Sequence, residues 1–253
     1  MNRFDLSSKI AFVSGSTRGL GLGIAEGLGQ HGARVVLNGR SADGVAAAVK
    51  SLKQRGLKAA GYAFDVTDET AIAQNAARIE AEVGPIDILV NNAGINHRHP
   101  MAEFKTEHYR AVMSTNVDSV FFLCREVGRR MIARQRGKII NIGSIAGHIS
   151  RQKIVPYSAS KGAVHLITRG LAVEWAEHNI QVNAIAPGII ETDMTDGMRN
   201  DPEFMAWSES RIPAGRWGKP EDLVGAAVFL ASPAADYVTG HVLFVDGGWT
   251  ASY

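Results

Sequence analysis

Short apolar runs recur along this chain, and each is followed by a longer segment with helical periodicity. The runs cover residues 10–14, 34–37, 59–64, 88–91, 138–142, 181–185 and 242–245. Apolar runs of this length are typical of strands buried on both faces, and helices are the usual connection between parallel strands. With right-handed crossovers, the alternation predicts an α/β fold, a doubly wound parallel sheet of seven strands with helices on both faces.

Helix starts are marked by residues that cap or open a first turn. These are Ser41 before an alanine-rich run, Thr67 before two acids, Thr106 before Glu107, and Pro220 before two acids. A chain of 253 residues can bury a full core. No repeat or linker divides it, so we expect one domain over residues 1–253.

The alternation of short apolar runs and helical segments is interrupted at residues 189–218. This stretch is polar and irregular, with several methionines and tryptophans scattered through it. A departure of this length inside a domain is usually a functional lid or a disordered linker. Because it carries large apolar side chains, we interpret it as a substrate lid.

The charge and hydropathy of the chain exclude several partner classes. The formal net charge is +2 and basic residues form no long run, which argues against nucleic acid or an acidic membrane as a partner. No stretch reaches the roughly 18 apolar residues of a membrane span, and the first residues contain no apolar signal core. We therefore expect a cytoplasmic protein that acts on a small molecule.

A glycine-rich turn follows the first predicted strand. Gly15, Gly19 and Gly21 stand in a G-x-x-x-G-x-G pattern, with Ser16 and Leu20 between them, at the start of a predicted helix. Such a turn lets the backbone approach a pyrophosphate, and the helix N-terminus offers free N–H groups. The pattern predicts a dinucleotide site, and the competing interpretation is a tight turn that needs glycine for packing.

The end of the second strand bears on the choice of cofactor. Asp or Glu there accepts hydrogen bonds from the ribose of NAD, whereas this chain has Asn38 and Arg40. Arg40 and Arg18 suit a 2′-phosphate, so NADP is favoured over NAD. The alternative for each is a surface arginine that binds no ligand.

Two further strand ends carry polar or small residues. Asp65, followed by Val66, closes the third strand and is either an acceptor for the adenine amino group or an ordinary loop residue. Asn92, Ala93 and Gly94 follow the fourth strand, at the edge where such sheets bind ligands.

Tyr157 and Lys161 place a phenol and an ammonium four residues apart at the head of a predicted helix. Residues at this spacing share a helix face. A tyrosine hydroxyl ordinarily titrates near about 10, and a nearby positive charge favours its phenolate. The pair therefore indicates acid–base chemistry at Tyr157, although a chance pair on a solvated helix has the same spacing.

These motifs together resemble the short-chain dehydrogenase/reductase family in its single-domain, Rossmann-type form. The similarity covers essentially the whole chain, and a serine at position 14 in place of the usual threonine keeps the hydroxyl. It rests, in chain order, on the glycine turn, residues 91–94, Asn116, Ser144, the Tyr157 and Lys161 pair, and Pro187 and Gly188 followed by Thr192.

The resemblance implies roles for these residues. Tyr157 would be the general acid or base, and Ser144 would hold the reacting oxygen. Lys161 would bind the nicotinamide ribose and lower the pKa of the tyrosine, while Asn116 would retain a water on the proton path. Residues 187–192 would cover the nicotinamide, and the family implies a homotetramer.

Within the family, the chain is most similar to the gluconate 5-dehydrogenases and other sugar-acid dehydrogenases. The stretches that carry this closer similarity are residues 37–40, 85–89, 114–117, 213–218, 223–230 and 245–249. The 3-oxoacyl-[acyl-carrier-protein] reductases share many of them and are the main alternative. A third hypothesis is a nucleotide-sensing protein of the same fold, but such a protein is expected to lack some of the catalytic residues, and all four are present here.

A sugar acid needs a cation for its carboxylate. Arg98 follows the fourth strand and Arg151 follows Ser144, so both are candidates for substrate binding, as against solvated loop arginines. His97 and His99 resemble a metal pair only superficially, because no carboxylate or cysteine ligand has matching spacing.

Overall fold

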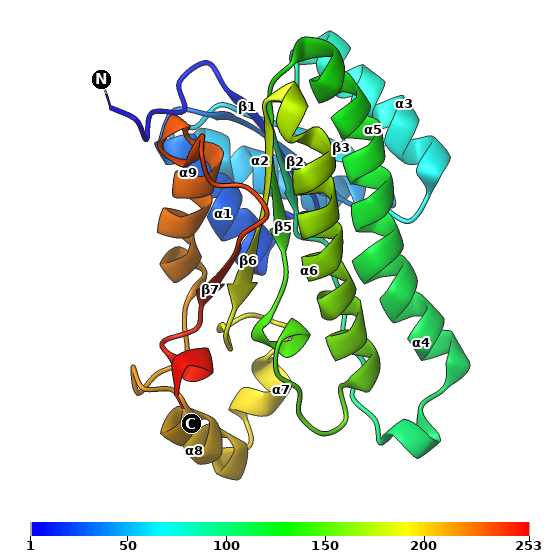
Figure 1. Cartoon of the computed structure of the whole chain (residues 1–253), viewed down its shortest axis with the longest axis vertical. Coiled ribbons are helices and arrows are strands. Elements are labelled where there is room, and N and C mark those ends of the chain that lie inside the picture. The colour runs from blue at the N-terminus through cyan, green and yellow to red at the C-terminus, as the bar shows by residue number, and fades with distance from the viewer. Residues whose placement is uncertain (1, 253) are drawn as a thin grey trace.

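The computed structural model describes residues 2–252, which form a layered α/β molecule around one sheet (Figure 1). The sheet has seven strands in the order β3-β2-β1-β4-β5-β6-β7, and all neighbouring strands are parallel. The fold predicted from the sequence is confirmed, with every strand within two residues of its expected bounds. The strands are β1 (Ile10–Val13), β2 (Arg34–Gly39), β3 (Ala59–Ala63), β4 (Ile88–Asn91), β5 (Gly137–Ile142), β6 (Ile180–Pro187) and β7 (Val242–Val245).

Helices cover both faces of the sheet (Figure 1). Their bounds are α1 (Gly19–Gln30), α2 (Ala42–Gln54), α3 (Glu69–Glu82), α4 (Thr106–Met113), α5 (Ser119–Arg134), α6 (Val155–Trp175), α7 (Asp196–Arg199), α8 (Pro202–Arg211) and α9 (Val224–Ala231). Side chains of α1, α2 and α9 pack on one face, and those of α3, α5 and α6 pack on the other.

The alternation of side chains along β1 shows how the two cores arise. Ala11 and Val13 belong to the core under α1 and α9, whereas Ile10 and Phe12 belong to the core under α5 and α6. Successive side chains of a strand point to opposite faces, so a strand covered on both sides must be apolar throughout. This requirement explains the continuous apolar runs in the sequence.

The predicted helix starts are close to the observed ones. Ser41 caps α2 and accepts a hydrogen bond from the Gly44 N–H. The cap of α3 is Asp68 rather than Thr67, which instead donates to the Asp65 carboxylate. Thr106 is the first residue of α4, and Pro220 opens a 3₁₀ turn (Pro220–Leu223) that leads into α9.

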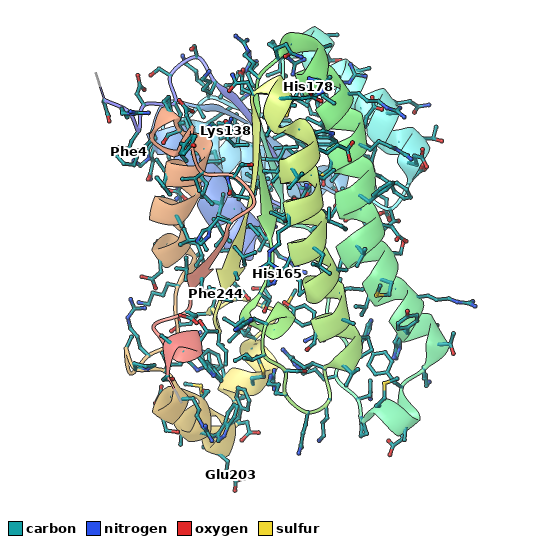
Figure 2. All side chains as sticks on the ribbon, in the orientation of Figure 1. Phe4, Lys138, His165, His178, Glu203 and Phe244 are labelled. Carbon is teal, nitrogen blue, oxygen red and sulfur yellow. The ribbon has the colours of Figure 1, made fainter. Side chains whose placement is uncertain are left out.

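Residues 189–218 are more ordered than the sequence suggested. They contain α7 and α8, and their two ends are joined by a parallel bridge between Ile190 and Gly218. A stretch whose sequence has no regular apolar period therefore contains two helices. This segment lies beyond the carboxyl ends of the strands, and Figure 2 shows Glu203 on α8 at the opposite end of the molecule from Lys138 and His178.

Within residues 2–252, none of the helices combines the length and the apolar character needed to cross a bilayer.

Candidate active site

Tyr157 and Lys161 lie in the first turns of α6, as their spacing predicted. The Lys161 side chain is buried, and its ammonium donates a hydrogen bond to the Ile142 carbonyl at 2.8 Å. The Lys161 Nζ lies 5.8 Å from the centre of the Tyr157 ring. The end of β5 and the head of α6 are therefore tied together at this pair.

Ser144 stands just past the end of β5. Its backbone is extended, and its Oγ accepts a hydrogen bond from the Ala146 N–H at 3.0 Å, which opens the short 3₁₀ turn Ile145–Gly147. Ser144 and Tyr157 line the same cavity. Two of the four predicted catalytic side chains thus face one space.

Burial raises the pKa of Tyr157, and the Ser144 hydroxyl and the positive charges of Arg98 and Arg151 act against this rise. Burial lowers the pKa of Lys161 to about 8. The sequence led us to expect that Lys161 would lower the tyrosine pKa. In the structure, the charges that favour the phenolate come from the two arginines instead.

Asn116 is fully buried in a π-helical segment (Ser114–Asp118) that joins α4 to α5. Its amide accepts from the Ile95 N–H at 2.8 Å and donates to the Ile95 carbonyl at 3.0 Å and to Ser160 Oγ at 3.0 Å. Ser160 in turn donates to the Tyr157 carbonyl at 2.7 Å. Such π segments are frequent at functional sites, and this one connects the loop after β4 to the tyrosine.

Two positions of the glycine-rich turn have no room for a side chain. Gly15 has φ +59°, and a Cβ there would lie 2.9 Å from the Ala93 Cα. A Cβ on Gly21 would lie 2.4 Å from the Asn92 amide nitrogen, which donates to the Gly15 carbonyl. Both positions therefore serve packing within the turn.

Gly19 faces a different neighbour from the other two glycines of the turn. Its φ is +56°, and its added Cβ would lie 3.6 Å from the Thr192 Cγ2 in the segment after β6. Among residues 2–252, no side chain caps α1, so its first N–H groups have no side-chain acceptor there. These features fit a site for a pyrophosphate between the turn and this segment.

Several residues predicted to bind cofactor have side chains that are used inside the protein. The Asn38 amide accepts from the Gly15 N–H at 3.2 Å and donates to the Phe64 carbonyl at 3.1 Å. Ser16 Oγ donates to the Val13 carbonyl at 2.7 Å. The Leu20 and Val66 side chains pack in the two cores.

The residues predicted to hold the adenosine end lie around the same edge of the sheet. Arg18 is exposed and forms an ion pair with Asp193 at 2.9 Å. Arg40 is exposed, and within residues 2–252 no carboxylate lies within ion-pair distance of it. One carboxylate oxygen of Asp65 accepts two hydrogen bonds from Thr67, so that oxygen stabilises the loop, as in the alternative given for this residue above.

The predicted nicotinamide end brings β6 beside β7. The Gly188 N–H donates to the Val245 carbonyl at 3.0 Å, and a Cβ on Gly188 would lie 2.8 Å from the Asp246 Cα. Pro187 is the buried last residue of β6. The Thr192 N–H donates to Thr195 Oγ1 at 2.9 Å, which fixes the segment that faces Gly19.

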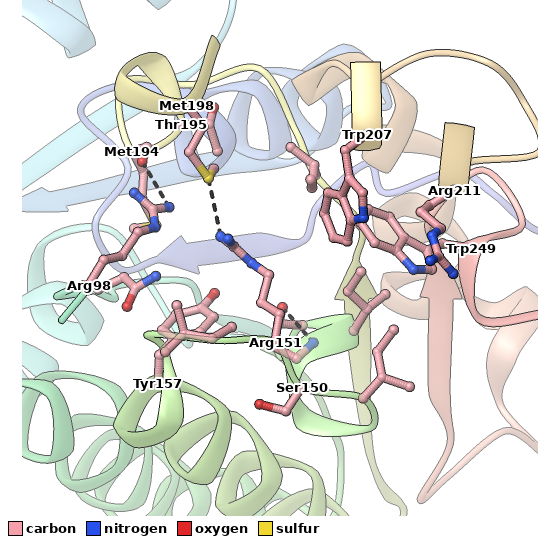
Figure 3. Close-up of a pocket in the computed structure, with 18 residues that line it drawn as sticks. Arg98, Ser150, Arg151, Tyr157, Met194, Thr195, Met198, Trp207, Arg211 and Trp249 are labelled. Carbon is pink, nitrogen blue, oxygen red and sulfur yellow. Dashed lines mark hydrogen bonds between the residues drawn. The ribbon is translucent and has the colours of Figure 1, made fainter. Parts of the chain in front are cut away.

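A cavity of about 310 Å³ lies above Tyr157, between the end of β5 and the segment that carries α7 and α8 (Figure 3). Arg98 and Arg151 both line it. Arg98 donates to the Met194 carbonyl at 3.5 Å, and its Nε is buried without a partner. Arg151 donates to Met198 Sδ at 3.1 Å and lies 5.1 Å from the centre of the Phe204 ring.

Neither of these guanidinium groups pairs with a carboxylate of residues 2–252, and burial lowers the pKa of both. A half-buried cation without an acidic neighbour is costly unless an anion joins it. The cavity therefore offers an anion site beside Tyr157.

Sequence reasoning did not assign several residues of the cavity. The methionines, Trp207 and Arg211 lie in the predicted lid, but Asn96 and Trp249 lie in two other segments without a shared motif. Met194, Met198, Trp207 and Arg211 belong to the predicted lid without having been singled out as substrate contacts, whereas the cavity residues outside any predicted site include Asn96, Ser150 and Trp249.

The histidines beside Arg98 stack on one another. The His97 and His108 rings lie 4.2 Å apart and are nearly parallel, and His99 stacks on His108 at 5.6 Å. Across residues 2–252, no group of three or more His, Cys, Asp or Glu side chains is placed to hold a metal ion.

Comparison with known proteins gives consistent relatives. A family model described as enoyl-(acyl carrier protein) reductase matches residues 15–250. The chain is 50% identical to a gluconate 5-dehydrogenase of Gluconobacter oxydans, over 98% of this chain and 97% of that protein. It is 47% identical to a 5-keto-D-gluconate 5-reductase of Escherichia coli, over 97% of this chain and 96% of that protein.

The fold also matches solved structures. A gluconate 5-dehydrogenase from Burkholderia cenocepacia, solved in complex with NADP and tartrate, has a TM-score of 0.98 and is 44% identical. The match covers 100% of this chain and 99% of that one.

Proposed function

The chain belongs to the short-chain dehydrogenase/reductase family, and from that premise we propose that it is an NADP-dependent oxidoreductase acting on a sugar acid. It would interconvert a secondary alcohol and a ketone, with gluconate and 5-ketogluconate as the preferred pair. The observation that carries the proposal is a pair of guanidinium groups, Arg98 and Arg151, that meet no carboxylate of the described residues, in the cavity that also holds Tyr157 and Ser144. The names of the relatives above, gluconate 5-dehydrogenase and 5-keto-D-gluconate 5-reductase, support the same substrate class.

In this proposal Tyr157 moves the proton. Its hydroxyl faces the cavity, and its raised pKa makes the protonated form dominant at neutral pH, as a general acid requires during ketone reduction. In the reverse direction the arginine charges favour the phenolate, which accepts the proton of the alcohol. Ser144 would orient the reacting oxygen toward Tyr157.

Lys161 and Asn116 would act behind the tyrosine. Gly94 separates them, since a Cβ on Gly94 would lie 3.4 Å from Asn116 Oδ1 and 3.6 Å from Lys161 Nζ. With a pKa of about 8, Lys161 is able to release and regain a proton near neutral pH. The pair would therefore resupply the proton that Tyr157 gives up.

The residues around the glycine turn fit NADP. Gly19 faces Thr192 across the start of α1, which no side chain of the described residues caps. Arg40, at the end of β2, pairs with no carboxylate of these residues, whereas an acid there would repel a 2′-phosphate. Lys161 would hold the nicotinamide ribose, and residues 187–192 would cover the ring. NADP, when bound, supplies or accepts the hydride at the substrate carbon.

The segment 189–218 would act as a lid. It contributes Ile189, Met194, Met198, Trp207 and Arg211 to the cavity lining. A segment that closes over the cavity excludes water from the reacting carbon and holds the substrate against Tyr157.

Reduction of a 3-oxoacyl thioester is the second candidate function. Much of the cavity lining is apolar, which suits an acyl chain, and the matching family model is described by an acyl-carrier-protein substrate. The two arginines beside Tyr157 favour an acid instead, because a neutral acyl chain would leave both guanidinium groups without a partner. A sensing protein would not need the complete set of Asn116, Ser144, Tyr157 and Lys161.

The test is the oxidation of NADPH and of NADH with 5-ketogluconate, other keto-sugar acids, an uncharged ketohexose and an acetoacetyl thioester. We expect the fastest turnover with NADPH and a keto-sugar acid. In Tyr157→Phe we expect the rate to fall at least about 100-fold, because the proton donor is gone. NADPH binding, followed by nucleotide fluorescence, should persist in this variant and shows that it is folded.

Turnover of the thioester alone would overturn the sugar-acid proposal in favour of acyl reduction. An unchanged rate in Tyr157→Phe would overturn the proposed catalytic set.

A further inference from the structure

A third arginine lines the cavity, and the proposed reaction does not use it. Of the cavity residues within the described part of the chain, three are arginine (Arg98, Arg151 and Arg211) and none is Asp or Glu. A sugar monocarboxylate brings one negative charge to this lining. Two of the arginines suffice for it, which leaves the third without an assigned partner.

The arginines are divided between two ends of the cavity (Figure 3). Arg98 and Arg151 lie on the Tyr157 side and are the arginines whose charges act on the tyrosine. Burial lowers the pKa of Arg151, and the like charge of Arg98 adds to this effect. Figure 3 shows Arg211 with Trp207 and Trp249, away from Arg98.

The surroundings of Arg211 are aromatic rather than acidic. Arg211 ends α8, and its guanidinium carbon lies 6.0 Å from the centre of the Trp207 ring, one helical turn earlier. Trp207 and Trp249 meet edge to face at 5.8 Å. Within residues 2–252, no carboxylate lies within ion-pair distance of Arg211.

These features suit one end of an acidic sugar chain. A guanidinium binds a carboxylate or a phosphate through two parallel hydrogen bonds. Flat indole surfaces pack against the C–H groups of a polyhydroxylated carbon chain, which is apolar along its C–H faces. Arg211 with the two tryptophans therefore has the elements of a second anion subsite.

We propose that this enzyme binds sugar acids with an anionic group at each end of the carbon chain, held by Arg211 at one end and by Arg98 and Arg151 at the other. The inference rests on the proposed function and deepens it: the reacting alcohol and Tyr157 are the same, and a dianionic derivative of gluconate replaces gluconate itself as the preferred substrate. We expect a six-carbon chain with two charged ends to present one charge to each cluster, whichever end lies near Tyr157. The second group is either a carboxylate, as in a hexaric acid, or a phosphate ester.

The test compares gluconate, glucarate and 6-phosphogluconate as substrates for NADP⁺ reduction, with an uncharged hexitol as reference. For a dianion that wild type oxidises, we expect kcat/KM to be at least about tenfold higher than for gluconate. For a dianion that binds without being oxidised, we expect its inhibition constant against gluconate to be at least about tenfold lower than the KM of gluconate. Glucarate and 6-phosphogluconate separate the two sources of the second charge. Preference for one identifies it as carboxylate or phosphate.

Arg211→Gln should reduce this preference at least about tenfold, because it removes the charge and keeps most of the side chain. Arg34→Gln is the matched control. Arg34 is an exposed arginine at the start of β2, at the opposite edge of the sheet from the cavity. We expect it to leave the preference unchanged, and thermal unfolding of each variant shows whether the fold is intact.

Gluconate turnover without any preference for the dianions, or a preference that Arg211→Gln leaves unchanged, overturns the second subsite alone. If wild type does not oxidise gluconate or reduce 5-ketogluconate, the proposed function itself has failed.

Discussion

Lys161 is buried as a charged group, and its surroundings explain its low pKa. Burial is the cause of the shift to about 8, and the ammonium has the Ile142 carbonyl as a hydrogen-bond acceptor. A carbonyl dipole compensates the charge only in part. The protein therefore keeps this ammonium at a free-energy cost, which is expected of a residue retained for its function.

Lys161→Met should stabilise the protein at neutral pH and abolish activity. In the unfolded chain the lysine pKa is near 10.5, so between about pH 8 and 10.5 the unfolded state holds more protons and stability rises with pH. Below pH 8 the full cost of burying the charge remains, at most about 3 kcal/mol. Methionine removes that cost.

Urea unfolding at pH 7 and pH 9.5 measures the effect. We expect the advantage of Lys161→Met over wild type to fall to roughly half at the higher pH. The variant lacks the hydrogen bond to Ile142 at both pH values, and the dependence of that bond on the lysine charge is already contained in the lysine pKa. An equal difference at the two pH values would contradict the assigned lysine pKa.

Arg40 should decide the choice of cofactor. If its guanidinium meets the 2′-phosphate, Arg40→Asp replaces attraction by repulsion and should weaken NADP binding at least about 100-fold, while NAD binding is kept or improved. Equilibrium titration with both reduced nucleotides measures this. Lys50→Asp is the control, because it makes an equal charge change at an exposed position of α2. Equal losses of affinity for both nucleotides in Arg40→Asp would show that Arg40 does not bind the 2′-phosphate.

The sequence was informative about residue identity and less so about side-chain direction. Tyr157, Lys161, Ser144 and Asn116 stand in a recognisable order, and the structure brings them together. Asn38 was expected at the cofactor, but its amide faces the Gly15 N–H and the ends of β3. A local pattern does not distinguish an amide that joins two loops from one that faces a ligand.

At the scale of the elements, the contact between α5 and α6 depends on one missing side chain. A Cβ on Gly128 in α5 would lie 2.4 Å from the Trp175 ring in α6, and Trp175 is buried. Gly128→Ala should therefore destabilise the protein by about 1–3 kcal/mol, because the ring has to move in a packed core. Urea unfolding at constant pH measures it.

Gly225→Ala is the matched control for this change. Gly225 lies in the exposed first turn of α9, and an added Cβ meets no atom within 4 Å among the described residues. We expect a change between zero and about 1 kcal/mol in the stabilising direction, since alanine restricts the unfolded chain. Equal destabilisation by both alanines would contradict the steric explanation.

The start of α8, within residues 189–218, was not predicted from the sequence. Asp201 caps α8 by accepting hydrogen bonds from the Glu203 and Phe204 N–H groups, and Pro202 occupies the first turn. An Asp-Pro-Glu helix start was therefore present in the sequence. It was overlooked because the segment lacks a regular apolar period, and its Trp207 and Arg211 face a cavity rather than a core.

At the scale of the whole molecule, the sheet was predictable, and the cavity was predictable only at its Tyr157 side, where Arg98 and Arg151 were candidates for substrate binding. Strand identity depends on local apolar runs, and handedness then limits the topology. The cavity instead gathers Arg98, Arg151, Arg211 and Trp249 from four distant segments. No pattern along the chain links Arg211 and Trp249 to the two predicted arginines, so this meeting becomes visible only when the sheet brings its carboxyl-edge loops together.

The outer faces of α5 and α6 carry large apolar side chains that the single chain leaves in solvent. Leu166 is 65% exposed, Val173 is 84% exposed and Phe121 is 48% exposed. Figure 1 shows α5 and α6 side by side on one flank of the molecule. Apolar side chains gathered on one flank mark an association surface. We propose that these helices form a subunit contact in a homotetramer.

Val173→Asp tests this assembly because the position is open in the single chain. In an isolated chain, the carboxylate would remain hydrated and change stability little. In a symmetric contact it would bring like charges together inside an apolar interface, so we expect the molar mass from light scattering to fall at least twofold. Phe4→Asp, at an exposed apolar residue 46% accessible near the other flank, should leave the mass unchanged. A wild-type monomer at assay concentration would contradict the proposal, because the exposed leucine and valine would then have no partner to explain them.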